Sequence, residues 1–288
     1  MSEQNNRKKK LRIRYRLSVV FFGAVLIFGL MFYKYMKTVT LEEVLSENRT
    51  ITFFDHNDKK KDDTASDDGN ITPDSDGDTM SGEPEEVVNP VPECEPVDKS
   101  YLNDCVFIGD SITYGLSLYG AVPSSNVLAS VAMSLSKADT EKIDTSFGSV
   151  TVIEALTEMS PKNIYVMLGS NGAAYTSPAE MYQTYQAFLN KVRIACPDSR
   201  VYIISTPPVT EGKENSPESP IKNANLDELN SKLLEYANNN GVHYLDMNSY
   251  LKNDLGYLPS DYADNDGMHF KSSTYTLFVE YILSHVAG

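Results

Sequence analysis

The sequence predicts an α/β fold: a three-layer α/β/α sandwich with a five-stranded parallel sheet as its middle layer. From about residue 101 onward, short runs rich in β-branched and aromatic residues alternate with helical patterns. The short runs are almost continuously apolar, as expected for strands that are buried on both faces. Strands that alternate with helices imply parallel pairing. Five such strands make a flavodoxin-like arrangement the natural architecture.

The five predicted strands cover, in chain order, residues 105–108, 126–129, 163–168, 200–205 and 242–246. The clearest predicted helix begins after Ser177, because Pro178 suits the first helical position and Glu180 completes a capping box. Apolar and aromatic residues then recur at three- and four-residue spacing. The same spacing predicts two further helices at residues 225–238 and 273–285.

Loops that follow parallel strands gather at one edge of the sheet, where functional groups collect. In this chain those loops begin at Gly109, Gly169 and Asp246. We therefore expect the residues just beyond these three positions to lie close together.

Charge divides the chain of 288 residues into three regions. Residues 1–37 carry a net charge of +8, residues 38–98 carry −14, and the remaining residues carry −9. The total of −15 argues against nucleic acid as a partner, because phosphate binding requires a basic face.

Residues 17–33 form an uncharged apolar run that is long enough, as a helix, to cross a bilayer core. A basic tail at residues 1–16 precedes this run, so the positive-inside rule predicts a single-pass cell-membrane protein with a cytoplasmic N-terminus. The alternative is a cleaved signal peptide, but the run is followed by no A-x-A-like cleavage site. We therefore expect the C-terminal part of the chain outside the cytoplasmic membrane.

Residues 34–99 are rich in Asp, Glu, Pro, Gly and Ser and predict an acidic disordered stalk, followed by a folded domain at residues 100–288. A calcium loop is the alternative for part of this stalk, because four acidic residues occupy positions 1, 3, 5 and 12 of such a loop: Asp74, Asp76, Asp78 and Glu85. Thr79 stands where that loop requires glycine, and no amphipathic helix flanks it. A solvated linker is the favoured interpretation.

The three cysteines, Cys94, Cys105 and Cys196, allow at most one internal disulfide. No Cys/His spacing in the chain is typical of a metal site.

Ser111, in "VFIGDSITYG", directly follows the first predicted strand and is a candidate nucleophile. A serine nucleophile needs a base, most often histidine. Of the four histidines, His56 lies in the stalk, His243 inside a strand and His285 in the last helical turn. His269 is left, in the polar loop "ADNDGMHF" before the last predicted helix.

Asp266 lies three residues upstream of His269 and is placed to orient its imidazole, with Asp264 as a rival for that role. Asn171, in "GSNG" after the third strand, offers an amide donor for an oxyanion at the same sheet edge as Ser111. Each of these short motifs is also compatible with an ordinary turn.

In the order "GDSIT", "GSN" and "DGMH", the chain resembles the SGNH (GDSL-type) hydrolase family, in a membrane-anchored bacterial form, over about residues 103–288. The resemblance implies that Ser111 is the nucleophile and that Asp266 and His269 complete its triad. It places Asn171 in the oxyanion hole with the N–H of Ser111, and it implies neither a metal nor an organic cofactor. Asp110, which such a triad does not require, is then expected to shape the turn.

The chain departs from the family pattern at two positions. The family usually has a glycine after the second strand, whose N–H joins the oxyanion hole; here Ala132 is the best match, with Met133 next. Alanine still supplies an N–H, but a positive φ would strain it. Gly172 stands where the family often has Asp, which bears on the substrate loop.

The resemblance implies a two-step acyl transfer by an extracytoplasmic serine esterase. By location, the expected substrate is an O-acetyl or other acyl ester on a cell-envelope glycan. Two alternatives are an O-acyltransferase with the same triad and a non-catalytic surface binding protein that keeps the fold. Tyr114, Tyr119 and Tyr175 are candidates for stacking on sugars, and the polar insertion at residues 207–223 is either a substrate lid or a solvated loop.

Overall fold

The computed structural model describes residues 87–288. The predicted membrane helix at residues 17–33 and the alternative calcium loop lie outside the described residues. Within residues 87–288, no helix has both the length and the apolar character needed to cross a membrane.

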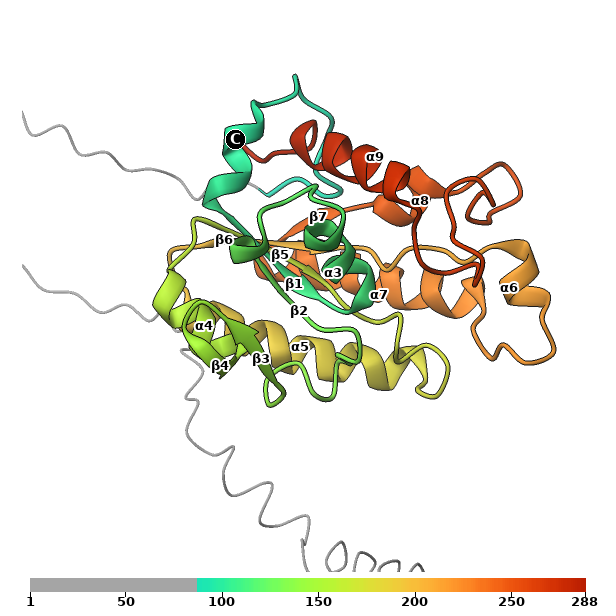
Figure 1. Cartoon of the computed structure of the whole chain (residues 1–288), viewed down its shortest axis with the longest axis horizontal. Helices are drawn as coiled ribbons and strands as arrows, with labels where there is room; N and C mark the ends of the chain where they lie inside the picture. The colour runs from blue at the N-terminus through green and yellow to red at the C-terminus, as the bar shows by residue number, and fades with distance from the viewer. Residues whose placement is uncertain (1–86) are drawn as a thin grey trace, which may run out of the picture. The chain divides into compact units, whose positions relative to one another are not determined.

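A five-stranded, entirely parallel sheet forms the centre of the domain, which confirms the predicted fold class (Figure 1). Its strands stand in the order β2-β1-β5-β6-β7. Their bounds are β1 Cys105–Gly109, β2 Val127–Ala129, β5 Asn163–Met167, β6 Arg200–Ile204 and β7 His243–Leu245. The five predicted strands coincide with these to within two residues at each end.

Helices cover both faces of the sheet, as Figure 1 shows. One apolar cluster packs the inward residues of the sheet against α4 (Val152–Met159), α5 (Pro178–Ala195) and α7 (Asn223–Asn240). A second cluster packs the other face against α3 (Ser111–Leu118), α8 (Met247–Leu251) and α9 (Ser272–Leu283). Three short helices complete the domain: η1 (Lys99–Asp104), η2 (Ser124–Asn126) and α6 (Glu211–Asn215).

The capping box predicted at the start of α5 is present. The Ser177 hydroxyl accepts a hydrogen bond from the Glu180 N–H, and the Glu180 carboxylate accepts one from the Ser177 N–H at 3.2 Å. These two bonds satisfy backbone donors that the first helical turn leaves unpaired. The sequence alone therefore fixes where this helix begins.

A ladder of aromatic rings runs across the sheet on the face that α9 covers. Phe107, Tyr165, Tyr202 and His243 are paired in register on the neighbouring strands β1, β5, β6 and β7. Their ring centroids are 5.0, 4.5 and 4.8 Å apart in that order, and each pair is stacked. His243 is thus packed inside a strand, as the sequence predicts, and its ring continues the core.

The structure adds an antiparallel hairpin, β3 (Lys142–Thr145) and β4 (Gly148–Thr151), that the sequence analysis did not predict. Only Ile143 among its strand residues is buried, so its apolar pattern is too weak to reveal it. The turn carries its own signal: Gly148 has a φ of +97°, and the Thr145 hydroxyl accepts from the Phe147 N–H at 3.1 Å.

The end of the predicted stalk, residues 87–99, is packed against the domain, and the prediction that these residues are disordered is wrong. Strand β7 is the last strand of the sheet and has no further strand beside it. The Val91 N–H donates to the Tyr244 carbonyl, and the Asn89 side chain accepts from the Tyr244 N–H and donates to the Val242 carbonyl. The segment therefore satisfies backbone groups that an open sheet edge would expose.

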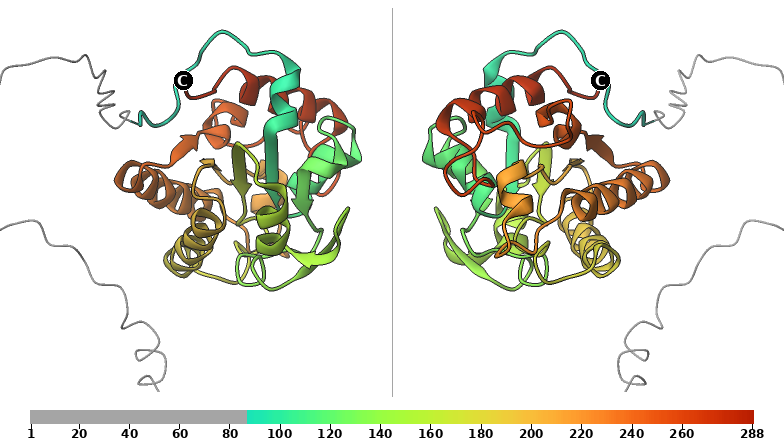
Figure 2. Two further views of the ribbon diagram at one scale, coloured as in Figure 1. Left: turned by 90° about the vertical axis from the view of Figure 1, so that its left-hand side faces the viewer. Right: turned by 90° about the vertical axis from the view of Figure 1, so that its right-hand side faces the viewer.

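The same segment continues along the C-terminal end of the chain, and Figure 2 shows the two side by side. Backbone hydrogen bonds join Cys94 to Ser284 and Val97 to Leu283. The acidic composition of residues 87–99 concealed this packing, because the bonds of Val91, Cys94 and Val97 use backbone groups that every sequence carries. Cys94, Cys105 and Cys196 are all free thiols.

Replacing Asn89 by alanine removes both side-chain bonds to the edge of β7. We expect Asn89→Ala to lower the free energy of unfolding by about 1–3 kcal/mol, since it leaves strand groups without partners. Urea unfolding measures the change. Asn103→Ala, at an exposed asparagine, is the matched control, and an equal loss in both variants would contradict this prediction.

Candidate active site

Ser111 is the first residue of α3, directly after strand β1 and the N-cap residue Asp110. The sharp turn depends on Gly109: a Cβ at this position would lie 2.0 Å from Thr113 Oγ1 and 2.4 Å from the Met167 carbonyl oxygen. Only glycine allows this approach. Since the first N–H groups of a helix have no partner inside it, the N–H of Ser111 is directed away from the helix.

Ser111, His269 and Asp266 form one continuous line of hydrogen bonds. Ser111 Oγ lies 2.8 Å from His269 Nε2, and His269 Nδ1 lies 2.5 Å from Asp266 Oδ2. The other carboxylate oxygen of Asp266 accepts from the N–H groups of Met268 and His269, both at 3.0 Å. The sequence-predicted nucleophile, base and carboxylate are therefore brought together.

Asp264, the rival carboxylate, does not contact the imidazole. Its N–H donates to the His269 carbonyl at 2.7 Å, and its carboxylate accepts from the Asn265 N–H. His285, beyond the end of α9, stacks on Tyr281 with ring centroids 3.9 Å apart. Elimination of the other histidines from the sequence thus identified the one that faces Ser111.

The pKa of Asp266 is lowered. Burial raises it, but the hydrogen bonds from the His269 ring and from the N–H groups of Met268 and His269 outweigh this effect. The carboxylate therefore stays ionised beside the imidazole. An ionised partner on Nδ1 favours the tautomer with its proton on that nitrogen, which leaves Nε2 as an acceptor toward Ser111.

The loop of Asp266 and His269 rests on the insertion at residues 207–223. The Gly267 carbonyl accepts from the Thr210 N–H at 2.9 Å, and Thr210 caps helix α6. Val209 is buried, and both its N–H and its carbonyl bond to the Asn223 side chain. The two ends of the insertion are therefore packed and support the loop, whereas residues 211–220 are exposed or half-buried, as the solvated-loop alternative expects.

Asn171 lies in the turn after β5, and its side-chain amide donates to the carbonyls of Met133 at 2.8 Å and Val131 at 3.3 Å. The amide thereby fastens the loop after β2, a contact that no sequence signal indicated. Ala132 is exposed in that loop and Met133 is fully buried. Among residues 87–288, Ser160 alone combines a side chain with a positive φ, so Ala132 is free of the expected strain.

Asp110 shapes the turn, as expected from the sequence. Its Oδ1 accepts from the Ile112 N–H at 3.1 Å, and only 1% of the residue is exposed. Its Oδ2 has no hydrogen-bond partner among the described residues. Burial raises the pKa of Asp110 to about 6. The Ile112 N–H, the polar groups of Ser170 and the attraction of His269 lower this pKa, but by less than burial raises it.

A cavity of about 440 Å³ opens beside the triad. Ser111, Asp266 and His269 line it together with exposed apolar and polar side chains. Tyr114 and Tyr119 line it as well, whereas Tyr175 is 90% exposed and is not part of its wall. Within residues 87–288, no group of three His, Cys, Asp or Glu side chains is arranged to hold a metal ion.

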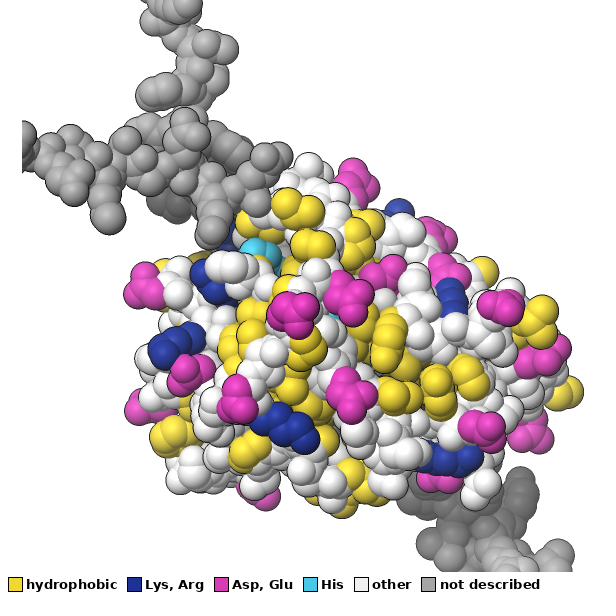
Figure 3. Space-filling model, turned by 90° about the horizontal axis from the view of Figure 1, so that it is seen from above, with side chains coloured by type: hydrophobic (Ala, Val, Ile, Leu, Met, Phe, Trp, Pro, Cys, Tyr) yellow, Lys and Arg dark blue, Asp and Glu magenta, His cyan; other side chains and the backbone are white. Residues whose placement is uncertain are grey.

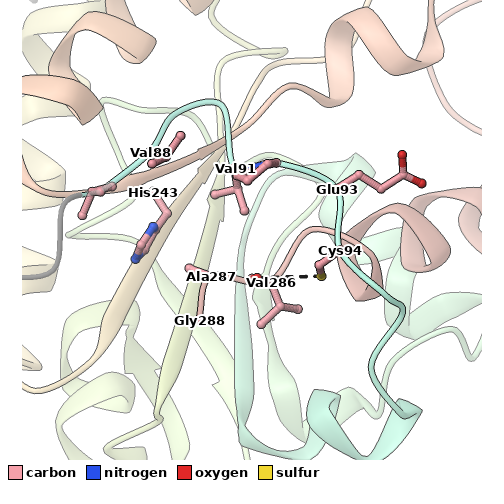
Figure 4. Close-up of a pocket in the computed structure, with 10 residues that line it drawn as sticks. Val88, Val91, Glu93, Cys94, His243, Val286, Ala287 and Gly288 are labelled. Atoms are coloured by element: carbon pink, nitrogen blue, oxygen red, sulfur yellow. Dashed lines mark hydrogen bonds between the residues drawn. The ribbon is translucent and has the colours of Figure 1, made fainter.

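A second cavity, of about 240 Å³, lies where the first described residues meet the C-terminus (Figure 4). Val88, Val91, Val286 and His243 contribute to its wall, and the Cys94 thiol donates to the Val286 carbonyl at 3.9 Å. His243 begins strand β7, so this cavity lies at the amino edge of the sheet, opposite Ser111. It belongs to the junction of residues 87–94 with the C-terminus.

A family model described as "GDSL-like Lipase/Acylhydrolase family" matches residues 107–277. The chain belongs to this family. It is therefore an acylhydrolase, an enzyme of an esterase family. A comparison with curated proteins finds no match.

Several solved structures resemble this acylhydrolase. A Streptococcus pneumonia protein provisionally assigned as a platelet activating factor has a TM-score of 0.50 at 19% identity, over 64% of this chain and 87% of its own. A GDSL-like lipase of Bacteroides thetaiotaomicron has a TM-score of 0.48 at 16% identity, over 62% of this chain and 84% of its own. A Geobacillus acetyl-xylooligosaccharide esterase has a TM-score of 0.46 at 15% identity, over 64% of this chain and 94% of its own. At these identities, the first likeness supports the shared fold alone.

Substitution of Gly267 tests whether the contact with Thr210 positions the catalytic loop. Gly267 and Gly256 both have positive φ, of +73° and +84°, but only at Gly267 would a Cβ meet neighbours, with Thr210 Oγ1 at 2.4 Å. We expect Gly256→Ala to lose about 1 kcal/mol of stability, and Gly267→Ala to lose more because its Cβ must displace Thr210. Gly267→Ala should in addition lose at least ~10-fold in kcat/KM for ester hydrolysis, because a displacement of about 1 Å is costly at a reacting group. Equal activities of the two variants would refute the positioning role.

The buried Asp110 predicts an unusual dependence of stability on pH. The unfolded chain releases this proton near the ordinary value of 3.8 and the folded domain near pH 6, so folding stability falls as pH rises through this window. Asp110→Asn keeps a good N-cap residue and removes the charge. Between about pH 4 and about pH 7, its free energy of unfolding should rise relative to wild type by roughly 2 kcal/mol. Parallel curves from denaturant unfolding would contradict the prediction.

Proposed function

We propose that this acylhydrolase cleaves acyl esters through Ser111, His269 and Asp266, with a covalent acyl-enzyme intermediate. The observation that carries the proposal is the unbroken line of hydrogen bonds from Ser111 Oγ through His269 to Asp266 at the wall of a cavity. Nucleophile, base and orienting carboxylate in this geometry are the three parts that serine-based acyl transfer requires.

In the first step, His269 Nε2 takes the proton of Ser111 as Oγ attacks the ester carbonyl carbon. The imidazolium that forms is stabilised by Asp266, whose pKa is lowered by its bonds to the loop. His269 then gives the proton to the leaving alkoxide, and the acyl group stays on Ser111. In the second step a water molecule attacks the acyl-enzyme with His269 again as base, which releases the acid and restores the serine.

The oxyanion of each tetrahedral intermediate needs donors on the side of Ser111. We assign this role to the N–H groups of Ser111 and Ala132 and to the side-chain amide of Asn171. The longer of the two amide bonds of Asn171, at 3.3 Å to the Val131 carbonyl, is the one that an oxyanion would replace. A charged acceptor makes the stronger hydrogen bond, so this exchange favours the transition state over the resting enzyme.

An acyl ester of a cell-envelope glycan is the substrate class that we propose. This part rests on the sequence: an apolar run at residues 17–33 after a basic tail, and an acidic stretch that precedes the domain. Those features favour an enzyme tethered to the membrane with its domain outside the cytoplasm. Protease treatment of intact cells tests this location. We expect the domain to be cleaved on intact cells, and cleavage only after lysis would contradict the proposal.

A fluorophosphonate probe tests the nucleophile. We expect the probe to label wild-type protein and to leave Ser111→Ala unlabelled, because the activated serine oxygen attacks phosphorus as it attacks an ester. Ser117→Ala, in the same helix, is the matched control and should be labelled as wild type. Intact-mass and peptide mass spectrometry give the site. Folded wild-type protein that stays unlabelled would refute the proposed mechanism and leave a binding role for the fold.

An added acceptor sugar distinguishes an esterase from an O-acyltransferase. Acetate release from an acetylated oligosaccharide is measured with and without an excess of a second, unacetylated sugar. An esterase releases free acetate in both mixtures. Acetyl groups recovered mainly on the added sugar would instead identify an O-acyltransferase.

A further inference from the structure

The outer face of α3 carries large apolar side chains where a surface helix would normally be polar. Tyr114, Leu118 and Tyr119 follow Ser111 by three, seven and eight residues, so they share its side of the helix. Their exposed fractions are 39%, 62% and 47%, and all three line the cavity beside the triad. Exposed apolar surface next to a reactive group marks a binding site.

The ring of Tyr119 is held in place by a tyrosine of α9. It packs on Tyr275 of α9 with ring centroids 5.2 Å apart, and the Tyr275 hydroxyl donates to the Ile112 carbonyl at 2.9 Å. Gly115 makes room for Tyr275, because a Cβ there would lie 1.8 Å from the tyrosine oxygen. The helix that presents Ser111 therefore also fixes the aromatic surface beside it.

The same cavity also has polar and acidic lining residues. Asp264 and Asn265 are exposed there, next to Asp266 and His269 of the triad. Among the described residues, those that line the cavity include no lysine or arginine. Figure 3, which views the domain from the α9 side, shows acidic and basic side chains interspersed with hydrophobic ones on this face.

We propose that this cavity binds the alcohol part of the ester as a neutral sugar ring, stacked on Tyr119 and Tyr114, with its hydroxyls donating to Asp264 and Asn265. This inference rests on the proposed esterase function and narrows its substrate. A pyranose has an apolar C–H face and a rim of hydroxyl donors, which matches a cavity lined by both aromatic rings and carboxylate and amide acceptors. A glycan that carries carboxylates or phosphates would meet Asp264 and Asp266 without any cation to offset the repulsion.

A fatty acyl chain is the rival occupant of the same wall. It would satisfy Tyr119 and Leu118, but it would exclude water from Asp264 and provide no hydrogen-bond donor in return. The mixed aromatic and acidic lining of the cavity therefore favours the sugar, and the experiment separates the two occupants.

The test compares ratios of kcat/KM for wild type and variants on four esters followed by acid release. The esters are an acetylated cello-oligosaccharide, an acetylated polygalacturonate oligomer, ethyl acetate and ethyl octanoate. For wild type we expect the neutral sugar ester to be preferred to the anionic one by at least ~10-fold. Tyr119→Ala should lower the ratio of neutral sugar ester to ethyl acetate by about 10-fold, and Tyr119→Phe, which keeps the ring, should retain it within about twofold.

Two further variants complete the design. Tyr175→Ala, at a tyrosine outside the cavity, should leave every ratio unchanged. Asp264→Asn should raise the ratio of anionic to neutral sugar ester several-fold, because it removes a like charge.

The possible failures differ from one another. If wild type hydrolyses none of the esters, the proposed function itself is wrong. If it hydrolyses ethyl acetate but Tyr119→Ala leaves the sugar ratio unchanged, only the sugar site is refuted. If Tyr119→Ala instead lowers the ratio of ethyl octanoate to ethyl acetate, the wall binds the acyl chain.

Discussion

The hydrogen bond between Ser111 Oγ and His269 Nε2 joins residues that are 158 positions apart in the chain. Its length depends on both ends being fixed independently. On one side, the parallel pairing of β1 with β2 and β5 and the absence of a side chain at Gly109 set the start of α3. On the other, the Gly267–Thr210 contact holds the loop of His269 against the insertion. Residues that never touch a substrate thus determine the geometry of the reacting atoms.

Asp110 illustrates how the turn at Ser111 is made at a cost in stability. A carboxylate that is almost fully buried caps α3 with one oxygen, while the other has no hydrogen-bond partner among the described residues. A neutral Asn would cap the helix nearly as well. The buried charge beside the nucleophile therefore lowers the free energy of unfolding. The stacking of aromatic rings across four strands of the sheet offsets this loss.

The features that the sequence predicts are those with a local chemical signature. Apolar runs gave the strands, the Ser177–Glu180 pair gave the start of α5, and the spacing of Asp266 and His269 gave their contact. What it did not predict depends on backbone groups or on partners distant in the chain. The segment at residues 87–99 binds backbone groups of β7 and of the C-terminal residues, and the Asn171 amide binds two carbonyls. Residue types do not reveal such acceptors, because every residue carries a backbone carbonyl.

The meeting of the two ends of the described chain also has a practical meaning. Asn89 and Ala287 both contact the amino half of the sheet, the former at Val242 and the latter at Arg200, whereas Ser111 follows the carboxyl end of β1. Anything joined to either end therefore leaves from the side opposite the cavity. Domains cut to residues 87–288 and immobilised on a support through a tag at either of these two ends would all present their reactive serine outward.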